Sequence, residues 1–271
     1  PQRRRSTMPA IVRARYDAAQ TTAENARHWA MADAMSADGA ASADVRKKLR
    51  ERARYEVANN SYAKGIVLTI ANDAIGTGPR LQLLTADPEI NRRVENAFAE
   101  WAKAVGLAEK LRAMRMAKAT DGEGFAVLTA NPVTDSPVQL DVQLVEADRV
   151  ASPIMSVLPT SNDIDGIILD VYGNPHTYTI LRQHPGDPGS LSTWKMPYDV
   201  VPADAVVHWF RVDRPGQHRG IPELTPALPL FAQLRRYTLA VIAAAETAAD
   251  FAAVLFTDAP ANGEAQALEP M

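Results

Sequence analysis

The chain has 271 residues, of which 46% are hydrophobic and 23% are charged, so it is long and apolar enough to fold into one large domain or two small ones. Its formal net charge of -3 lacks the basic excess of a protein that grips nucleic acid with its whole surface, so any DNA contact should be local. The absence of cysteine excludes disulfides, thiolate metal ligands and cysteine nucleophiles, and it fits a reducing compartment or a particle assembled in one.

The beginning of the chain is basic and then rich in alanine. Arg3, Arg4 and Arg5 are not followed by an apolar core with a cleavage site, so we expect a solvated basic arm rather than a secretory signal. The alanine-rich pattern of residues 10–35, with Trp29 as its largest apolar side chain, predicts a helix. Small residues over 36–42 should end it.

The next predicted helix, Val45 to Val57, carries a basic stripe and begins after Ser42 or Asp44, either of which can cap it. We call Arg46, Arg50 and Arg54 the arginine stripe, because a spacing of four residues places them on one helix face. Two interpretations stay open for this stripe. It is either a solvated face with a few surface ion pairs, or a contact for DNA or an acidic partner.

Further helices are expected up to residue 119. Asn59-Asn60 suits a helix end or a new cap, and the helical period that follows should stop at Gly76-Thr77-Gly78-Pro79. This glycine pair is weak evidence for phosphate binding because it follows a helix rather than a strand. Asp87-Pro88 opens a helix through Trp101 with an apolar stripe, and another helix covers Leu107 to Ala119.

The pattern then changes to short β segments, and a second helical region follows them. Alternating or β-branched runs predict strands at 125–130, 138–145, 166–171, 176–182 and 206–212. Gly173-Asn174-Pro175 should form the turn of a hairpin between the third and fourth of these. Helices, then strands, then a helix favour an α+β fold over alternating βαβ units.

The last strand breaks into a turn rich in arginine, glycine and proline, which we call the corner (residues 211–220), and the corner leads into a long helix. Glycine and proline fix the backbone of the corner, while Arg211, Arg214 and Arg219 are available for a carboxylate, a phosphate or a neighbouring subunit. The helix should run from about Pro222 to Phe256, and it is too charged and alanine-rich to span a bilayer. Its length and slimness favour contact between subunits over a role as an ordinary core helix.

No strong catalytic or metal-binding motif is present. The five histidines lack helical metal-ligand spacing, and His208 is expected to be a structural histidine. Asp121 and Glu123 could form a carboxylate pair, but in a glycine-rich turn they should instead cap it and remain solvated. Since nucleophile-elbow and Walker-type motifs are also missing, the sequence predicts no catalytic residue, no metal site and no cofactor.

An ordered set of segments resembles the lambda-type portal proteins of tailed bacteriophages from about residue 13 to 257. No single segment is decisive, but their order along the chain is specific. They comprise residues 52–63, 75–78, Trp101, 121–123, 144–149, 166–167, Asp170 with Gly173, Tyr178, 208–210 and 214–220.

The resemblance implies a structural subunit of a ring, typically of twelve copies, at one capsid vertex, through which DNA is packaged and ejected. It implies a location in the virion after assembly in the host cytoplasm, and no membrane. The implied partners are the major capsid protein and scaffold, terminase, head-completion and tail adaptor proteins, and double-stranded DNA.

Family members are roughly twice as long, so the resemblance implies that the returning half of the fold is missing from this sequence. We expect an N-terminal arm and helix, a helical wing-like region, a β-rich wing- or clip-like region, a long stem-like helix and a truncated tail. These segments are 1–41, 42–134, 135–220, 221–257 and 258–271.

A closed ring needs two different faces of each subunit to meet. We expect Arg211, Arg214 and Arg219 to form part of that interface by pairing with acidic groups such as Asp213 or Glu223 of the next subunit.

Two other classes of protein stay open. One is a metal-dependent DNA-processing enzyme or its accessory, with the arginine stripe on the duplex and a divalent metal held by Asp121, Glu123, Glu146 and Asp148. The other is a soluble adaptor that binds other proteins through its helical N-terminal region.

Overall fold

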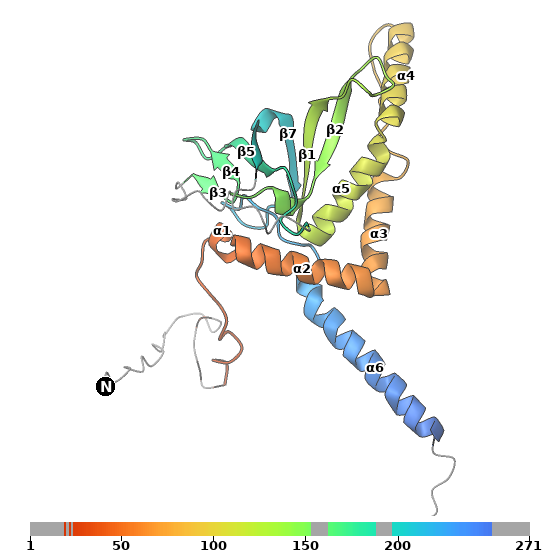
Figure 1. Cartoon of the computed structure of the whole chain (residues 1–271). Coiled ribbons are helices and arrows are strands. Elements are labelled where there is room, and N and C mark those ends of the chain that lie inside the picture. The colour runs from red at the N-terminus through yellow and green to blue at the C-terminus, as the bar shows by residue number, and fades with distance from the viewer. Residues whose placement is uncertain (1–18, 20–21, 23, 153–161, 188–196, 251–271) are drawn as a thin grey trace, which may run out of the picture.

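A computed structural model describes residues 19, 22, 24–152, 162–187 and 197–250. It shows an α+β body from which two helices, α4 and α6, project at opposite ends (Figure 1). No helix within these described ranges combines the length and apolar character that crossing a membrane requires.

The helical part of the body consists of α1 (Ala37–Ala40), α2 (Ala43–Asn59), α3 (Ser61–Ile75) and α5 (Leu107–Asp121). The predicted boundaries of α2, α3 and α5 are confirmed within a few residues. Asn60 caps α3, accepting hydrogen bonds from the amides of Tyr62 and Ala63, as its sequence position suggested. Ser42 precedes α2, but its side chain makes no capping hydrogen bond.

The structure describes residues 24–35 of the helix predicted over residues 10–35, and no helix is formed there. Residues 24–31 form turns, and the chain up to Ser36 is irregular. Trp29 is 52% exposed and Met31 is 92% exposed, so the apolar side chains of this segment are largely left in water. An isolated helix of this length is only marginally stable in water without such packing.

Two antiparallel sheets form the β part. The first has the order β2-β1-β7, with β1 (Glu123–Ala130) between β2 (Leu140–Val145) and β7 (Val206–Phe210). The second has the order β3-β4-β5-β6, formed by β3 (Asp163–Ile164), β4 (Ile167–Leu169), β5 (Pro175–Leu181) and β6 (Tyr198–Pro202). The predicted β4–β5 hairpin is confirmed, whereas β3 and β6 were not predicted.

The first sheet joins segments that the sequence suggested as separate regions. β1 comes from the segment 42–134, whereas β2 and β7 come from 135–220. In the register of this sheet, Phe125 lies opposite both Val145 and His208. Because β1 follows α5 directly, the sheet also anchors the helical part of the body.

Two apolar clusters hold the body together. One lies between α2, α3, α5 and the beginning of α6, and it contains Ala53, Ala63, Val67, Ala119, Leu224, Leu228 and Phe231. The other lies between the two sheets and contains Phe125, Val145, Ala147, Val150, Ile167, Tyr178 and Ile180. Three of its four residues from α2, α3 and α5 are alanine, which lets these helices approach closely.

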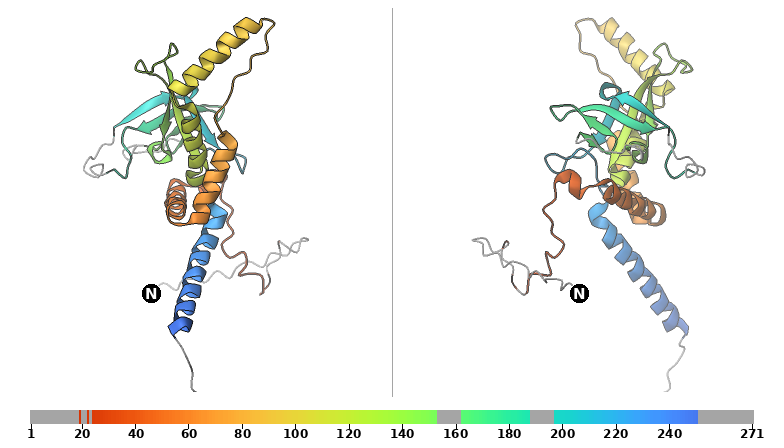
Figure 2. Two further views of the ribbon diagram at one scale, coloured as in Figure 1. Left: turned by 90° about the vertical axis from the view of Figure 1, so that its right-hand side faces the viewer. Right: turned by 60° about the vertical axis from the view of Figure 1, so that its left-hand side comes forward.

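The projecting helices bury little. α4 (Pro88–Ala104) is capped by Asp87 as predicted, but none of its residues is fully buried, although it carries the expected apolar stripe. α6 (Leu228–Asp250) follows a short 3₁₀ turn, η5 (Thr225–Ala227), and buries only Leu228 and Phe231 among its residues. The two views of Figure 2 agree that α6 extends away from the body. The predicted continuation of this helix to Phe256 lies outside the described residues.

Two glycines permit a close backbone approach in the body. A Cβ atom added to Gly220 would lie 2.2 Å from the carbonyl oxygen of Gly122, and one added to Gly122 would lie 2.4 Å from the backbone of Ile221. The end of the corner therefore crosses the turn between α5 and β1 at a distance that no side chain permits.

We predict that Gly220→Ala lowers the free energy of unfolding by at least about 1–3 kcal/mol, because the new methyl group must push two backbone segments apart. Thermal and denaturant unfolding followed by circular dichroism measures this loss. Gly65→Ala is the control, since nothing lies within 4 Å of an added Cβ there and α3 should gain about 0.5–1 kcal/mol. Equal effects of the two substitutions would contradict the close approach.

Candidate functional site

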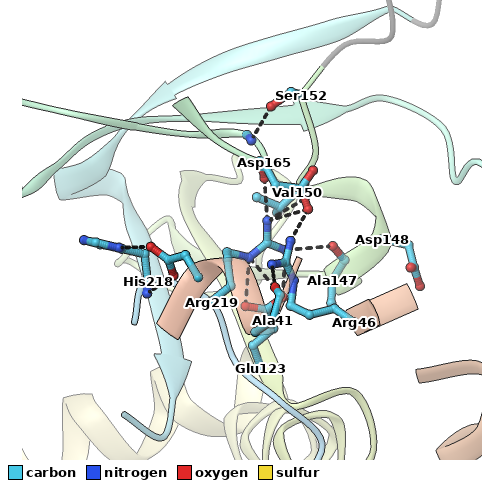
Figure 3. Close-up of polar contacts among 12 residues, drawn as sticks. Ala41, Arg46, Glu123, Ala147, Asp148, Val150, Ser152, Asp165, His218 and Arg219 are labelled. Carbon is cyan, nitrogen blue, oxygen red and sulfur yellow. Dashed lines mark hydrogen bonds and ion pairs between the residues drawn. The ribbon is translucent and has the colours of Figure 1, made fainter. Parts of the chain in front are cut away.

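The most concentrated group of charges in the described residues is a buried network around Arg219 and Glu123 (Figure 3). Both residues are completely buried. Arg219 Nη2 donates to Glu123 Oε1 over 2.7 Å, and Arg219 Nε lies 3.0 and 3.1 Å from the two carboxylate oxygens. Arg219 Nη1 donates to the carbonyl oxygens of Val150 and Asp165. The guanidinium group thus ties the corner to three other segments.

The local backbone explains how these two side chains meet. Gly122 ends α5 in a left-handed conformation with φ 93°, and β1 begins at the next residue, Glu123. The amide of Gly220 donates to Glu123 Oε2 over 2.9 Å, directly after Arg219 in the chain. The close approach of Gly122 and Gly220 therefore places the carboxylate against the arginine.

The arginine stripe of α2 faces this network, with Arg46 and Arg50 buried and Arg54 half-buried. Arg46 pairs with Asp165 and donates to the carbonyl of Ala41. Arg50 lies 2.9 Å from Asp148 and 3.6 Å from Glu123. Arg54 lies 2.7 Å from both Asp121 and Asp148. The sequence left open whether the arginine stripe contacts an acidic partner, and its acidic partners are found within the same chain. The interpretation of a solvated face is wrong for Arg46 and Arg50, because both are buried.

Asp165 enters the network from the turn between β3 and β4. Its φ of 48° lies in the left-handed region, which aspartate tolerates better than most residues. The following Gly166 has φ 87°, and its amide donates to Ser152 Oγ and Asp163. This turn holds Asp165 against both Arg46 and Arg219.

Burial and pairing act against each other in the ionisation of these groups. Burial by itself raises the pKa of Glu123, but the charge of Arg219 and hydrogen bonds from His208 and Arg219 hold that pKa well below its usual range. Burial lowers the pKa of Arg46 to about 10, with repulsion from Arg219 adding to the effect. Burial raises the pKa of Asp121, and the pairing with Arg54 offsets this only in part.

His208 is a buried partner of Glu123. Its Nε2 lies 3.1 Å from Glu123 Oε2, and its Nδ1 lies 3.4 Å from the hydroxyl of Tyr178. The ring stacks between Phe125 and Phe210, with centroid distances of 4.2 and 4.4 Å. Burial lowers the pKa of His208 despite the nearby carboxylate. This agrees with the structural role expected from the sequence.

The residues expected at a subunit interface fall into two groups. Arg219 is buried on Glu123, and Glu223 pairs within the chain with Arg115 and Lys118, so neither has its charge free for a neighbouring subunit. Arg211 and Arg214 are exposed on the corner. Arg211 pairs with Asp213 of its own chain, whereas the guanidinium group of Arg214 donates to the carbonyl of Met35 and meets no carboxylate among the described residues.

The carboxylates considered for metal binding are paired with arginines. Asp121 and Glu123 were expected to be solvated in their turn, but both are buried because the corner and α2 cover them. Within the described ranges, no three or more His, Asp or Glu side chains are grouped so that they could hold a metal ion. Asp148 forms ion pairs with Arg50 and Arg54. The carboxylate of Glu146 lies 3.3 Å from Nε2 of His184.

The sequence did not reveal which acid each arginine meets. It drew attention to Arg219, Glu123 and the arginine stripe separately, and it gave no role to Asp165. The one available signal was glycine, since Gly122, Gly166 and Gly220 each mark a tight approach next to a member of the network.

The buried charges bind one another within the chain. The two helices that project from the body, α4 and α6 (Figure 1), carry apolar residues with exposed side chains. Residues 23–270 match the family described as phage portal protein, lambda family. The chain therefore belongs to the lambda family of phage portal proteins, a family of structural components of the virion. A comparison with curated proteins found no match.

We predict that Glu123→Gln costs about 3–5 kcal/mol of unfolding free energy, because it removes the nearest counter-charge of the buried Arg219 and leaves only Asp165, at 3.4 Å. Urea denaturation at neutral pH measures the loss. Asp199→Asn is the matched control, since its partner Arg182 lies on the surface and the two side chains are 52% and 62% exposed. Only a small loss is expected there.

The same variant changes the acid dependence of stability. The pKa of Glu123 is depressed in the folded state, so its stabilisation is present above its unfolded pKa of about 4.3 and is lost as the pH falls below that value. Stability should thus decrease less steeply below about pH 4.3 in Glu123→Gln than in the parent protein. Parallel pH profiles would contradict a charged Glu123 in the native state.

Proposed function

We propose that this protein is a portal subunit that assembles into a closed ring, typically of twelve copies, at one capsid vertex and surrounds the channel through which DNA is packaged and ejected. Membership of the lambda portal family supports the portal role. The single structural observation that supports ring assembly is the exposed surface of α6.

One face of α6 forms an uncharged stripe without a partner in the described chain. Leu230, Leu234, Tyr237, Val241, Ala244 and Ala248, here called the α6 stripe, alternate spacings of four and three residues. All six are exposed, including Leu230 at 62% and Tyr237 at 69%. The stripe extends over roughly 27 Å at 1.5 Å per residue.

Such a stripe has the spacing of a helix that packs against another helix. The cost of leaving it in water is about 25 cal/mol for each Å² of apolar surface, which favours burial in an assembly. In a ring, the occupant is a neighbouring copy of this chain, because cyclic symmetry presents the same helix at each position.

The charge distribution suits a conduit for DNA. Each phosphate that is neutralised by lysine or arginine adds a binding contact that must be broken when DNA moves. The net charge is -3, and the arginine stripe and Arg219 are directed into the protein. Twelve such subunits would form an acidic ring that repels the duplex from its walls.

We propose that the subunit contacts the major capsid protein and scaffold during assembly in the host cytoplasm, and terminase and the head-completion and tail adaptor proteins thereafter. In this proposal the protein works without catalysis, as a docking platform and channel. The family is structural, and the buried carboxylates are already bound to arginines.

We predict that Val241→Glu abolishes or strongly reduces ring formation, because it places a charge in the middle of the α6 stripe. Mass photometry of the purified protein separates rings from single subunits. Ala240→Glu is the control, since it adds the same charge to an exposed position of α6 outside the stripe. If both variants form rings as the parent does, the α6 stripe is not the subunit contact.

A second prediction concerns the corner. Arg214 is exposed, and its guanidinium meets no carboxylate in the described chain, so it is available to an acidic group of a neighbouring subunit. Arg214→Glu should reduce the fraction of rings in mass photometry, whereas Arg182→Glu, on a different exposed surface, serves as a control. Unchanged rings would reject a role of Arg214 in the interface.

A further inference from the structure

The attachment of α6 to the body is narrow. Leu228 and Phe231, in the first turn of the helix, enter the apolar cluster beside Ala53 of α2 and Val67 of α3. From Ala232 onward no residue of α6 is fully buried in the described part of the chain. A helix of about 35 Å is thus anchored by its first turn.

One ion pair lies just beyond that anchor. Arg235 Nη2 of α6 is 2.5 Å from Glu56 Oε1 of α2. Glu56 is 5% exposed, and its other oxygen lies 3.4 Å from the side-chain nitrogen of Asn60. The guanidinium group of Arg235 also lies 5.1 Å from the centre of the Tyr55 ring, within the range of a cation–π contact. This pair is the outermost polar link between α6 and the body in the described residues.

Open grooves lie on both sides of this link. The groove between the outer face of α2 and the first turns of α6 has a volume near 610 Å³ and is lined by residues that include Arg52, Tyr55 and Pro229. The groove on the other side has a volume near 220 Å³ and is lined by residues that include Tyr62, Leu234 and Thr238. The first turns of α6 therefore border open space on two sides of the ion pair.

We propose that Glu56 and Arg235 form a clasp that sets the angle of α6, and that α6 pivots about Leu228 and Phe231 when the clasp opens. The closed state is favoured because an open clasp leaves the carboxylate of Glu56 buried without its counter-charge. The grooves provide the space into which the helix moves. This inference depends on the fold alone and does not require the proposed ring.

The movement is large enough to measure. About 22 Å of helix separates Phe231 from Glu246, so a tilt of about 10° displaces the far end by about 4 Å. Because the chain has no cysteine, spin labels can be attached at Lys64→Cys on α3 and Glu246→Cys on α6 without removing a native thiol. Both positions are exposed.

The experiment measures the distance between these labels by double electron–electron resonance in three further variants: Glu56→Gln, Arg235→Gln and Arg236→Gln. Arg236 is the matched control, because it is an exposed neighbouring cation with no ion pair among the described residues. Labelled chains are diluted with unlabelled chains so that only distances within one chain are recorded, whether or not rings form. Circular dichroism verifies that each variant is folded, and Arg235→Gln tests the clasp from the α6 side if Glu56→Gln does not fold.

We expect a narrow distance distribution in the parent and in Arg236→Gln, and a distribution that is broader or displaced by about 4 Å or more in Glu56→Gln and Arg235→Gln, in keeping with the helix geometry. A distribution that is already broad in the parent, or one that is equally narrow in all variants, would overturn the clasp. Mass photometry of the same samples reports separately on ring assembly, so failure of the proposed ring is distinguishable from failure of the clasp.

Discussion

The buried pair of Arg219 and Glu123 is the interaction on which the architecture of the body depends. It connects the corner to the start of β1, and through Arg219 Nη1 it also connects both to the backbone at Val150 and Asp165. The arginine stripe adds α2 to the same network. Ion pairs thus hold together segments that lie far apart in the sequence. Because these charges are buried, water cannot solvate one of them if its partner is lost.

Burying so many charges is costly, and the cost has a structural consequence. Two ions taken out of water regain their solvation energy only when geometry and hydrogen bonding are nearly complete. Arg219 meets this condition, since its donors reach a carboxylate and several carbonyl oxygens. An arrangement that shifted the corner relative to α2 would leave charges unpaired, so the network selects one arrangement of helices, corner and sheet over its alternatives.

The same network explains which arginines are absent from the surface of the subunit. Since the arginine stripe and Arg219 pair with acids of their own chain, these four arginines do not form an exposed basic face. The exposed surface of α4 and α6 carries apolar side chains instead, including Ile90 and Val241. Both helices project from the body (Figure 1). Within the described residues, most of α4 and α6 therefore lies outside the apolar clusters of the body.

The sequence by itself determined most of the local elements and the family. Caps such as Asn60 and Asp87, the period of the helices and the hairpin around Gly173 depend on neighbours a few residues apart, and they were predicted correctly. The helix expected up to residue 35 failed in its described part because alanine content cannot replace a packing partner for Trp29.

Only the tertiary structure decided the partners of the charges. A spacing of four residues placed Arg46, Arg50 and Arg54 on one face, but it could not show whether that face meets water, DNA or protein. Their acids come from residues 67 to 119 positions away, brought close by glycine approaches and sheet pairing that no local pattern encodes. The free energy of an ion pair depends on the distance between the charges and on their burial, and the separation of two residues in the sequence gives neither quantity.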